Sequence, residues 1–278
     1  MLRFRNERIT LALCPEQVAV LQSGRGQQHA VDELHVSTSP EPGHVLWKAS
    51  VSALADWLQG NPLKRTPVTL ILSNRLVRFA VLPWAANAQG ESATQALATA
   101  CLESQYGAMS GWTMRIDDGR HGQPRLVCAI ETALLDTLQS AFAARACPRV
   151  EPYFVTCWNR WRKTVGNDDA LFAVCEPGTT VIASIKNGRW QSVRAVSGQQ
   201  DRTGLFNVLA RESLLQGFNE PPAYYVHALP LGLETATDST SPWPEMKDPL
   251  TVLPQDIKIP AAENFSVAKL MALIGSAA

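Results

Sequence analysis

The sequence lacks an excess of charge of either sign and any long apolar run. Lysine and arginine together number 25, as do aspartate and glutamate, so the 278-residue chain has a formal net charge of zero. Proteins that bind nucleic acid usually present a basic face or tail, so we expect no nucleic-acid partner. No window reaches the roughly 18 uninterrupted apolar residues of a transmembrane helix, and residues 1–10 lack the apolar stretch of a signal peptide. We therefore expect a cytoplasmic chain.

Local signatures of catalysis and of metal binding are also missing. The sequence has no GxxxxGK[ST] phosphate loop, no HExxH and no GxSxG. Its cysteines are scattered without a CxxC pair and lie mostly within apolar runs, which predicts reduced thiols buried as small hydrophobic side chains. They are Cys14, Cys101, Cys128, Cys147, Cys157 and Cys175. We expect no catalytic side chain and no metal site.

What is present is the composition of a globular chain, with 46% hydrophobic and 18% charged residues. Hydrophobic spacing predicts strands at residues 9–13, 17–22, 68–72, 76–82, 112–116, 125–130, 171–175, 180–186, 190–196 and 224–229. It predicts helices at residues 50–59, 91–105, 133–145, 154–163, 202–216 and 265–274. Residues 29–44 indicate a loop or a ragged edge strand, and Asn187-Gly188 is typical of a hairpin turn. Strands followed by helices occur twice, which predicts an α/β (α+β) chain of two related lobes.

Changes in composition divide the chain into segments. Asn167-Asp168-Asp169 marks a boundary, and residues 233–260 are rich in proline, threonine, serine and aspartate. We therefore expect a first lobe over residues 1–166 with an inserted subdomain at about 85–150, a second lobe over residues 167–232, and a proline-rich tail over residues 233–278 that ends in a short amphipathic segment.

Three stretches together resemble one family. In the first, a strand with Arg78 ends at Leu82-Pro83, and a helix with Leu102-Glu103 follows. The second continues with a strand and a helix, and the third has the pattern of a meander. The stretches are residues 73–107, 125–161 and 171–196. They resemble the PilM and GspL cytoplasmic-domain family, which are actin-like proteins of type IV pilus assembly and type II secretion.

The likeness spans residues 9–229 as an order of elements. It implies a two-lobed fold of the actin-like ATPase or ribonuclease H type. In that fold two hairpins hold the phosphates of a nucleotide, and each supplies backbone amides and an acidic residue that acts through a divalent metal. The first hairpin here reads Leu13-Cys14-Pro15-Glu16, without the Asp-x-Gly of the family, and Pro15 has no amide hydrogen to donate.

The second hairpin matches the family better. Glu176, Gly178 and Thr179 stand where the family has its acid, glycine and hydroxyl, although Pro177 removes another amide. The resemblance therefore implies that Glu176, Gly178 and Thr179 hold the nucleotide if one binds. Because one hairpin is without the acid–glycine pair, the resemblance favours a pseudo-ATPase that needs no cofactor.

The function implied is that of a non-catalytic scaffold in a pilus or secretion platform. Such a scaffold docks the cytoplasmic tail of a single-pass inner-membrane protein of the PilN type, through which it lies at the inner membrane. An assembly ATPase and a second copy of the chain are further expected partners, and residues 251–278 are a candidate tether to a partner. Two alternatives stay open: a Mg-ATP-binding ATPase or kinase of the same fold, and an unrelated α/β protein with a small-molecule site in an apolar pocket.

Overall fold

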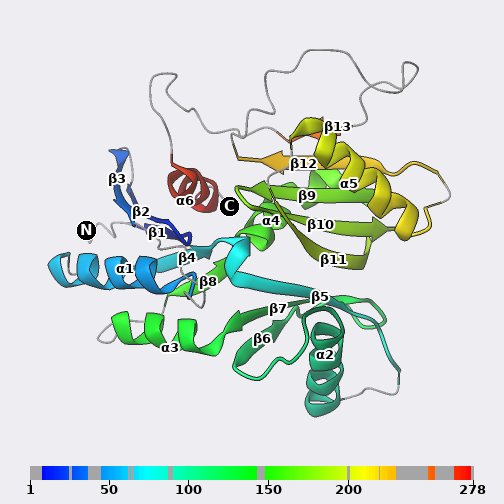
Figure 1. Ribbon diagram of the computed structural model, residues 1–278, viewed down its shortest axis with the longest axis horizontal. Coiled ribbons are helices and arrows are strands. Elements are labelled where there is room, and N and C mark those ends of the chain that lie inside the picture. Colours follow the sequence, from blue (N-terminus) through cyan, green and yellow to red (C-terminus); the bar gives the residue numbers. More distant parts are fainter. Residues whose placement is uncertain are drawn as a thin grey trace, which may run out of the picture. The chain divides into compact units, whose positions relative to one another are not determined.

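The computed structural model divides the chain into two compact units (Figure 1). Unit 1 comprises Met1–Val77, Ile130–Arg160 and Asp256–Ala278, and unit 2 comprises Arg78–Ala129 and Trp161–Gln255. The structure describes residues 8–24, 27–36, 45–61, 63, 66–86, 90–142, 148–198, 201–218, 220–229, 250–253 and 266–276. Each unit combines stretches that are far apart in the sequence.

A mixed sheet forms the centre of unit 1. Its described strands, in spatial order, are β3 (Gln27–His35), β2 (Gln17–Gly24), β1 (Arg8–Leu13), β4 (Val68–Leu72) and β8 (Arg149–Pro152). The first three form an antiparallel meander, and β4 and β8 extend the sheet in parallel from β1. The ragged edge strand expected within residues 29–44 is β3, whereas residues 37–44 lie outside the described residues. Strand β8 was not among the predicted strands.

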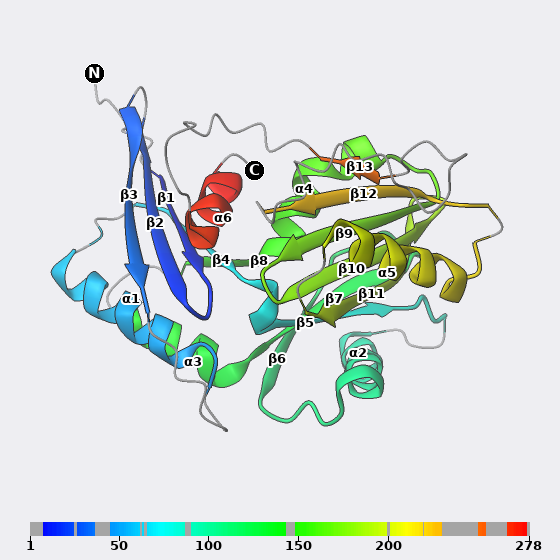
Figure 2. The same ribbon diagram turned by 45° about the horizontal axis from the view of Figure 1, so that its top comes forward.

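Helices cover the sheet of unit 1. They are α1 (Lys48–Gly60), α3 (Thr132–Ala141), the first part of α4 (Tyr153–Val165) and α6 (Val267–Ser276). Figure 2 shows α6 beside the strands of this sheet, and it contacts β1, β2 and β4. A Cβ built at Gly275 would lie 2.7 Å from Cγ1 of Ile71, so glycine permits this close approach. The helix predicted at residues 265–274 is therefore part of the core of its own chain.

The main sheet of unit 2 repeats the topology of unit 1. Its described strands, in spatial order, are β11 (Arg189–Ser197), β10 (Thr179–Lys186), β9 (Ala170–Glu176), β12 (Ala223–Ala228) and β13 (Leu250–Val252). Again an antiparallel meander is extended by two parallel strands. Leu205 and Leu209 of α5 (Arg202–Leu215) pack into its hydrophobic core. The repeat confirms the two related lobes that the order of elements predicted.

Two local predictions meet different outcomes in unit 2. Asn187 and Gly188 have φ values of 51° and 68°, which confirms the predicted hairpin turn between β10 and β11. The region 233–260 is not tail throughout, because β13 pairs in parallel with β12. Strand β13 was missed because it has only three residues, which show no hydrophobic alternation in a proline-rich stretch.

A smaller sheet is inserted between β4 and α3. It contains β5 (Val77–Leu82), β7 (Arg125–Glu131) and β6 (Trp112–Ile116), and α2 (Glu91–Tyr106) packs on it through Ala98 and Leu102. The guanidinium carbon of Arg78 lies 3.8 Å from the ring centre of Trp112, so the side chain on which the family resemblance partly rests packs inside this subdomain.

The lobe boundaries predicted at residues 166 and 232 stay a prediction, as does the extent of 85–150 for the inserted subdomain. None of the described helices is long and apolar enough to cross a membrane. The five described cysteines are free thiols, and Cys14, Cys157 and Cys175 are buried as predicted, whereas Cys147 lies outside the described residues.

Candidate functional site

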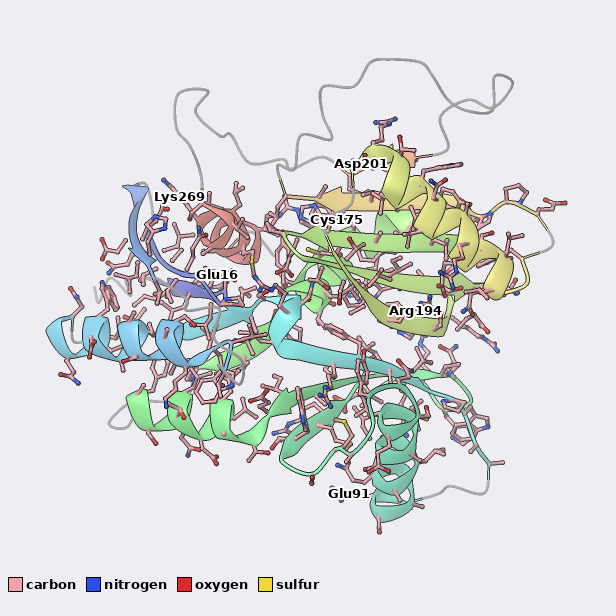
Figure 3. The ribbon with its side chains drawn as sticks, viewed as in Figure 1. Glu16, Glu91, Cys175, Arg194, Asp201 and Lys269 are labelled. Atoms are coloured by element: carbon pink, nitrogen blue, oxygen red, sulfur yellow. The ribbon has the colours of Figure 1, made fainter. Side chains whose placement is uncertain are left out.

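The turn between β1 and β2 is the first hairpin of the expected nucleotide site. The amide of Cys14 donates to the carbonyl of Gln17 at 2.8 Å, so Pro15 and Glu16 form a two-residue turn. Proline fits because this turn position needs no amide hydrogen for the ladder. Glu16 lies at the tip of the hairpin (Figure 3), where its Oε1 is 2.6 Å from Nη1 of Arg75. The carboxylate of this hairpin is therefore in an ion pair.

Arg75 is positioned by the segment that follows β4. The 3₁₀ turn Asn74–Leu76 begins at Ser73, whose hydroxyl accepts a hydrogen bond from the amide of Arg75 at 3.3 Å. The amide of Ser73 donates to the carbonyl of Leu13, and Oδ1 of Asn74 accepts from the amide of Phe154 at 2.8 Å. These bonds hold the ends of β1 and β4 and the start of α4 together.

The turn between β9 and β10 is the second hairpin and contains the three predicted nucleotide-site residues. Gly178 has a φ of 83°, the value that position i+2 of a type II turn requires after proline. Glu176 and Thr179 face each other across the turn and are only 3% and 5% exposed. The hydroxyl of Thr179 donates to the carbonyl of Val196 at 3.5 Å. Assignment of these residues to a nucleotide stays a prediction.

Burial also governs the chemistry next to this turn. Cys175 is buried directly before Glu176, and desolvation raises the pKa of its thiol to about 11, with the negative charge of Glu176 acting in the same direction. A hydrogen bond to Thr180 opposes the shift. Burial therefore disfavours the thiolate form of Cys175.

Taken one at a time, each described hairpin has two features that bear on whether it could hold the phosphates and metal of a nucleotide. A phosphate cradle needs backbone amides that point outward, and Pro15 and Pro177 have none. Of the two acids, Glu16 is paired with Arg75, and Glu176 is almost fully buried. The side chains that the structure describes also include no group of three or more His, Cys, Asp or Glu residues arranged to hold a metal ion.

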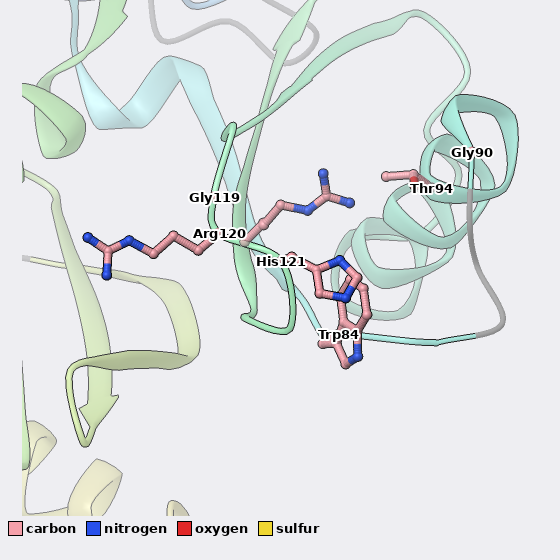
Figure 4. A pocket seen from close by; sticks show the side chains of 7 residues that line it. Trp84, Gly90, Thr94, Gly119, Arg120 and His121 are labelled. Atoms are coloured by element: carbon pink, nitrogen blue, oxygen red, sulfur yellow. The ribbon is translucent and has the colours of Figure 1, made fainter.

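A pocket that the sequence did not predict lies in the inserted subdomain (Figure 4). Its volume is about 380 Å³, and residues of α2 and of the loop between β6 and β7 line it. The indole of Trp84 meets the imidazole of His121 edge to face, with 4.3 Å between ring centres. The lining is completed by Gly90, Thr94, Gly119, Arg120 and Arg125. The sequence offers no clear signal for this pocket, because the loop between β6 and β7 contains Asp117 and Asp118 as well as Arg120.

Comparison with known proteins found likeness only at the level of structure. No protein-family model matches the chain, and no curated protein matches its sequence. The cytoplasmic domain of EpsL, an inner-membrane component of the type II secretion system of Vibrio cholerae, is similar over 98% of this chain and 95% of that domain, with 15% identity and a TM-score of 0.51. A Bacteroides thetaiotaomicron protein of unknown function, described as having an actin-like ATPase fold, is similar over 82% and 84%, with 11% identity and a TM-score of 0.56.

The fold is actin-like. The PilM–PilN type IV pilus biogenesis complex contains a further chain of this fold, similar over 82% of this chain and 83% of that chain, with 12% identity and a TM-score of 0.51. The likeness to PilM and GspL predicted from the sequence is thus confirmed for the actin-like fold. Components of type II secretion and type IV pilus assembly are among the proteins that share it.

Proposed function

We propose that this chain is a non-catalytic actin-like scaffold of a type II secretion or type IV pilus assembly platform. In this proposal it docks the cytoplasmic tail of an inner-membrane protein of the PilN type and lies at the membrane through that partner. Two similar structures support the proposal, one from a type II secretion component and one from a PilM–PilN complex.

The absence of ATPase activity is proposed because the two hairpin turns contain prolines although both sheets are regular. Both five-stranded sheets have the same topology, yet each phosphate-side turn contains a proline. Glu16 is engaged by Arg75, and the hydroxyl of Thr179 by a backbone carbonyl. A scaffold needs the sheets but not the phosphate-binding amides of the turns, so these features fit a scaffold.

Calorimetry with ATP and magnesium tests this part directly. We expect no heat of binding up to millimolar nucleotide, because neither described hairpin presents the groups that hold phosphate. Binding at micromolar strength that Glu176→Ala abolishes would contradict the proposal and favour the Mg-nucleotide ATPase or kinase. Circular dichroism of the same samples confirms that both proteins are folded.

Co-elution tests the docking part. The purified chain is mixed with the cytoplasmic tail of a PilN-type membrane protein from the same organism and passed over a sizing column. We expect a complex to elute earlier than the chain, while a tail with scrambled sequence elutes separately. Elution of both tails as free peptides refutes docking of this partner. Sedimentation of the chain alone, and with an assembly ATPase, tests the two further partners of the proposal.

A further inference from the structure

Two arginines and a histidine line the pocket of the inserted subdomain, whereas Asp117 and Asp118 of the same loop are not among its lining residues. Arg120, His121 and Arg125 come from the loop between β6 and β7 and from the first residue of β7. Among the residues that the structure describes, no carboxylate forms an ion pair with either arginine. A guanidinium presents its N–H donors in a planar fork that matches the two oxygens of a carboxylate. A hollow with uncompensated arginines favours an anionic ligand.

The side chain of Arg125 lies close to the backbone of Gly119. Its side chain is half-buried and passes directly over Gly119, where an added Cβ would lie 2.7 Å from Cγ and 3.3 Å from Cδ of Arg125. Glycine at this position therefore leaves room for the aliphatic stem of the arginine. A side chain at position 119 would therefore displace the stem of Arg125 and move its guanidinium.

The pocket also has an aromatic wall and an apolar annex. Trp84 is 40% exposed and stands edge to face with His121, so it offers an uncovered indole surface. A second, smaller hollow adjoins the pocket and shares Trp84, Thr94 and Arg125 with it. The remaining lining of this annex is Leu82, Pro83, Ala85, Leu97 and Gln123.

We propose that this pocket binds an acidic peptide segment. An aspartate or glutamate carboxylate pairs with Arg125, Arg120 adds charge at the rim, and a small aliphatic side chain next to the acid enters the annex beside Trp84. The annex is what favours a peptide over a free phosphate or a lipid headgroup, neither of which carries a methyl group adjacent to its charge. The inference rests on the proposed function in one respect, because the segment is then supplied by the partner tail.

Titration with a defined probe tests the site. The probe is acetyl-Ala-Val-Asp-Val-Asp-Ala-amide, and the readout is the indole N–H resonance of Trp84 in ¹⁵N-labelled full-length protein, assigned with Trp84→Phe. We expect a saturable shift in the wild type, at least tenfold weaker binding to Arg125→Gln, and unchanged binding to Arg115→Gln, an exposed arginine of β6 outside the pocket. Gly119→Ala displaces the stem of Arg125 and is expected to weaken binding in the same way.

Comparison of ligands gives a test that needs no variant. We expect the Asn-for-Asp version of the probe to leave the Trp84 resonance in place, and 10 mM inorganic phosphate or phosphatidylglycerol vesicles to compete poorly with the acidic probe. Equal shifts with the amide version, or full competition by phosphate or by vesicles, overturn the peptide assignment. A probe affinity that Arg125→Gln leaves unchanged overturns the site itself.

The same variant separates this inference from the proposed function. If the partner tail co-elutes equally with the wild type and with Arg125→Gln, the docking function stands and the pocket is not its site. If the acidic probe binds in an Arg125-dependent manner while no tail co-elutes, the pocket stands and the partner assignment fails. If the wild type binds both the probe and the tail and Arg125→Gln binds neither, the result supports both proposals.

Discussion

Helix α6 offers the sharpest test of how unit 1 is held together. Leu270 is 1% exposed and lies in the face of α6 that packs against the sheet. Truncation of a fully buried leucine removes its transfer free energy and leaves a cavity, which costs about 2–5 kcal/mol. We therefore expect Leu270→Ala to lower the free energy of unfolding of unit 1 by that amount. In a protein of this size the melting temperature falls by about 2–4 °C per kcal/mol.

The matched control is a leucine-to-alanine change on an exposed helix surface. Leu214 of α5 is 82% exposed, so Leu214→Ala removes little buried area and changes stability by at most about 0.5 kcal/mol. Both variants are followed by differential scanning calorimetry and by near-ultraviolet circular dichroism. If the two variants shift the melting transition equally, α6 is not part of the core. Residues 251–278 would then again be a candidate tether to a partner.

Three further outcomes follow from individual contacts. Arg194→Met leaves the buried carboxylate of Glu212 without its 2.9 Å ion-pair partner and is expected to cost about 3 kcal/mol in urea unfolding, most of which the added Glu212→Leu recovers. Asn74→Ala removes a buried acceptor for the first turn of α4 and is expected to cost about 1–3 kcal/mol, measured in the same way. Iodoacetamide at pH 8 is expected to alkylate half-exposed Cys101 before Cys175, because Cys175 is only 2% exposed and burial raises its thiol pKa to about 11. Burial raises the thiol pKa of Cys101 as well, so access of the reagent makes the main difference. Labelling is followed by mass spectrometry, and equal rates for the two thiols would refute the argument.

Elements with a strong local signal were predictable from the sequence. The Asn187-Gly188 turn is one, because its conformation depends on the two residues themselves. Strands β8 and β13 were not predictable, because four and three residues give no period to read. Both are strands only through pairing with a parallel neighbour, β4 and β12 respectively. Their identity is therefore a property of the tertiary fold.

The same distinction applies to the candidate sites. Glu176, Gly178 and Thr179 are near neighbours in the sequence, so the turn that joins them was visible at once. The ion pair of Glu16 with Arg75 joins residues 59 positions apart, and no local pattern indicates it. The pocket of the inserted subdomain likewise depends on α2 packing against the inserted sheet, which brings its helix and loop residues to one hollow.

The prolines of the two hairpins are compatible with the sheets of an actin-like fold. In an antiparallel hairpin the ladder bonds come from residues that flank the turn, as the bond from Cys14 to Gln17 shows. A proline at the first turn position removes an outward amide but none of these bonds, and it restricts the unfolded chain. Proline at Pro15 and Pro177 therefore costs the sheets little, whereas it removes a donor that a nucleotide would need. The amides that build the sheets and the amides that a phosphate would need are therefore different groups of the same turns.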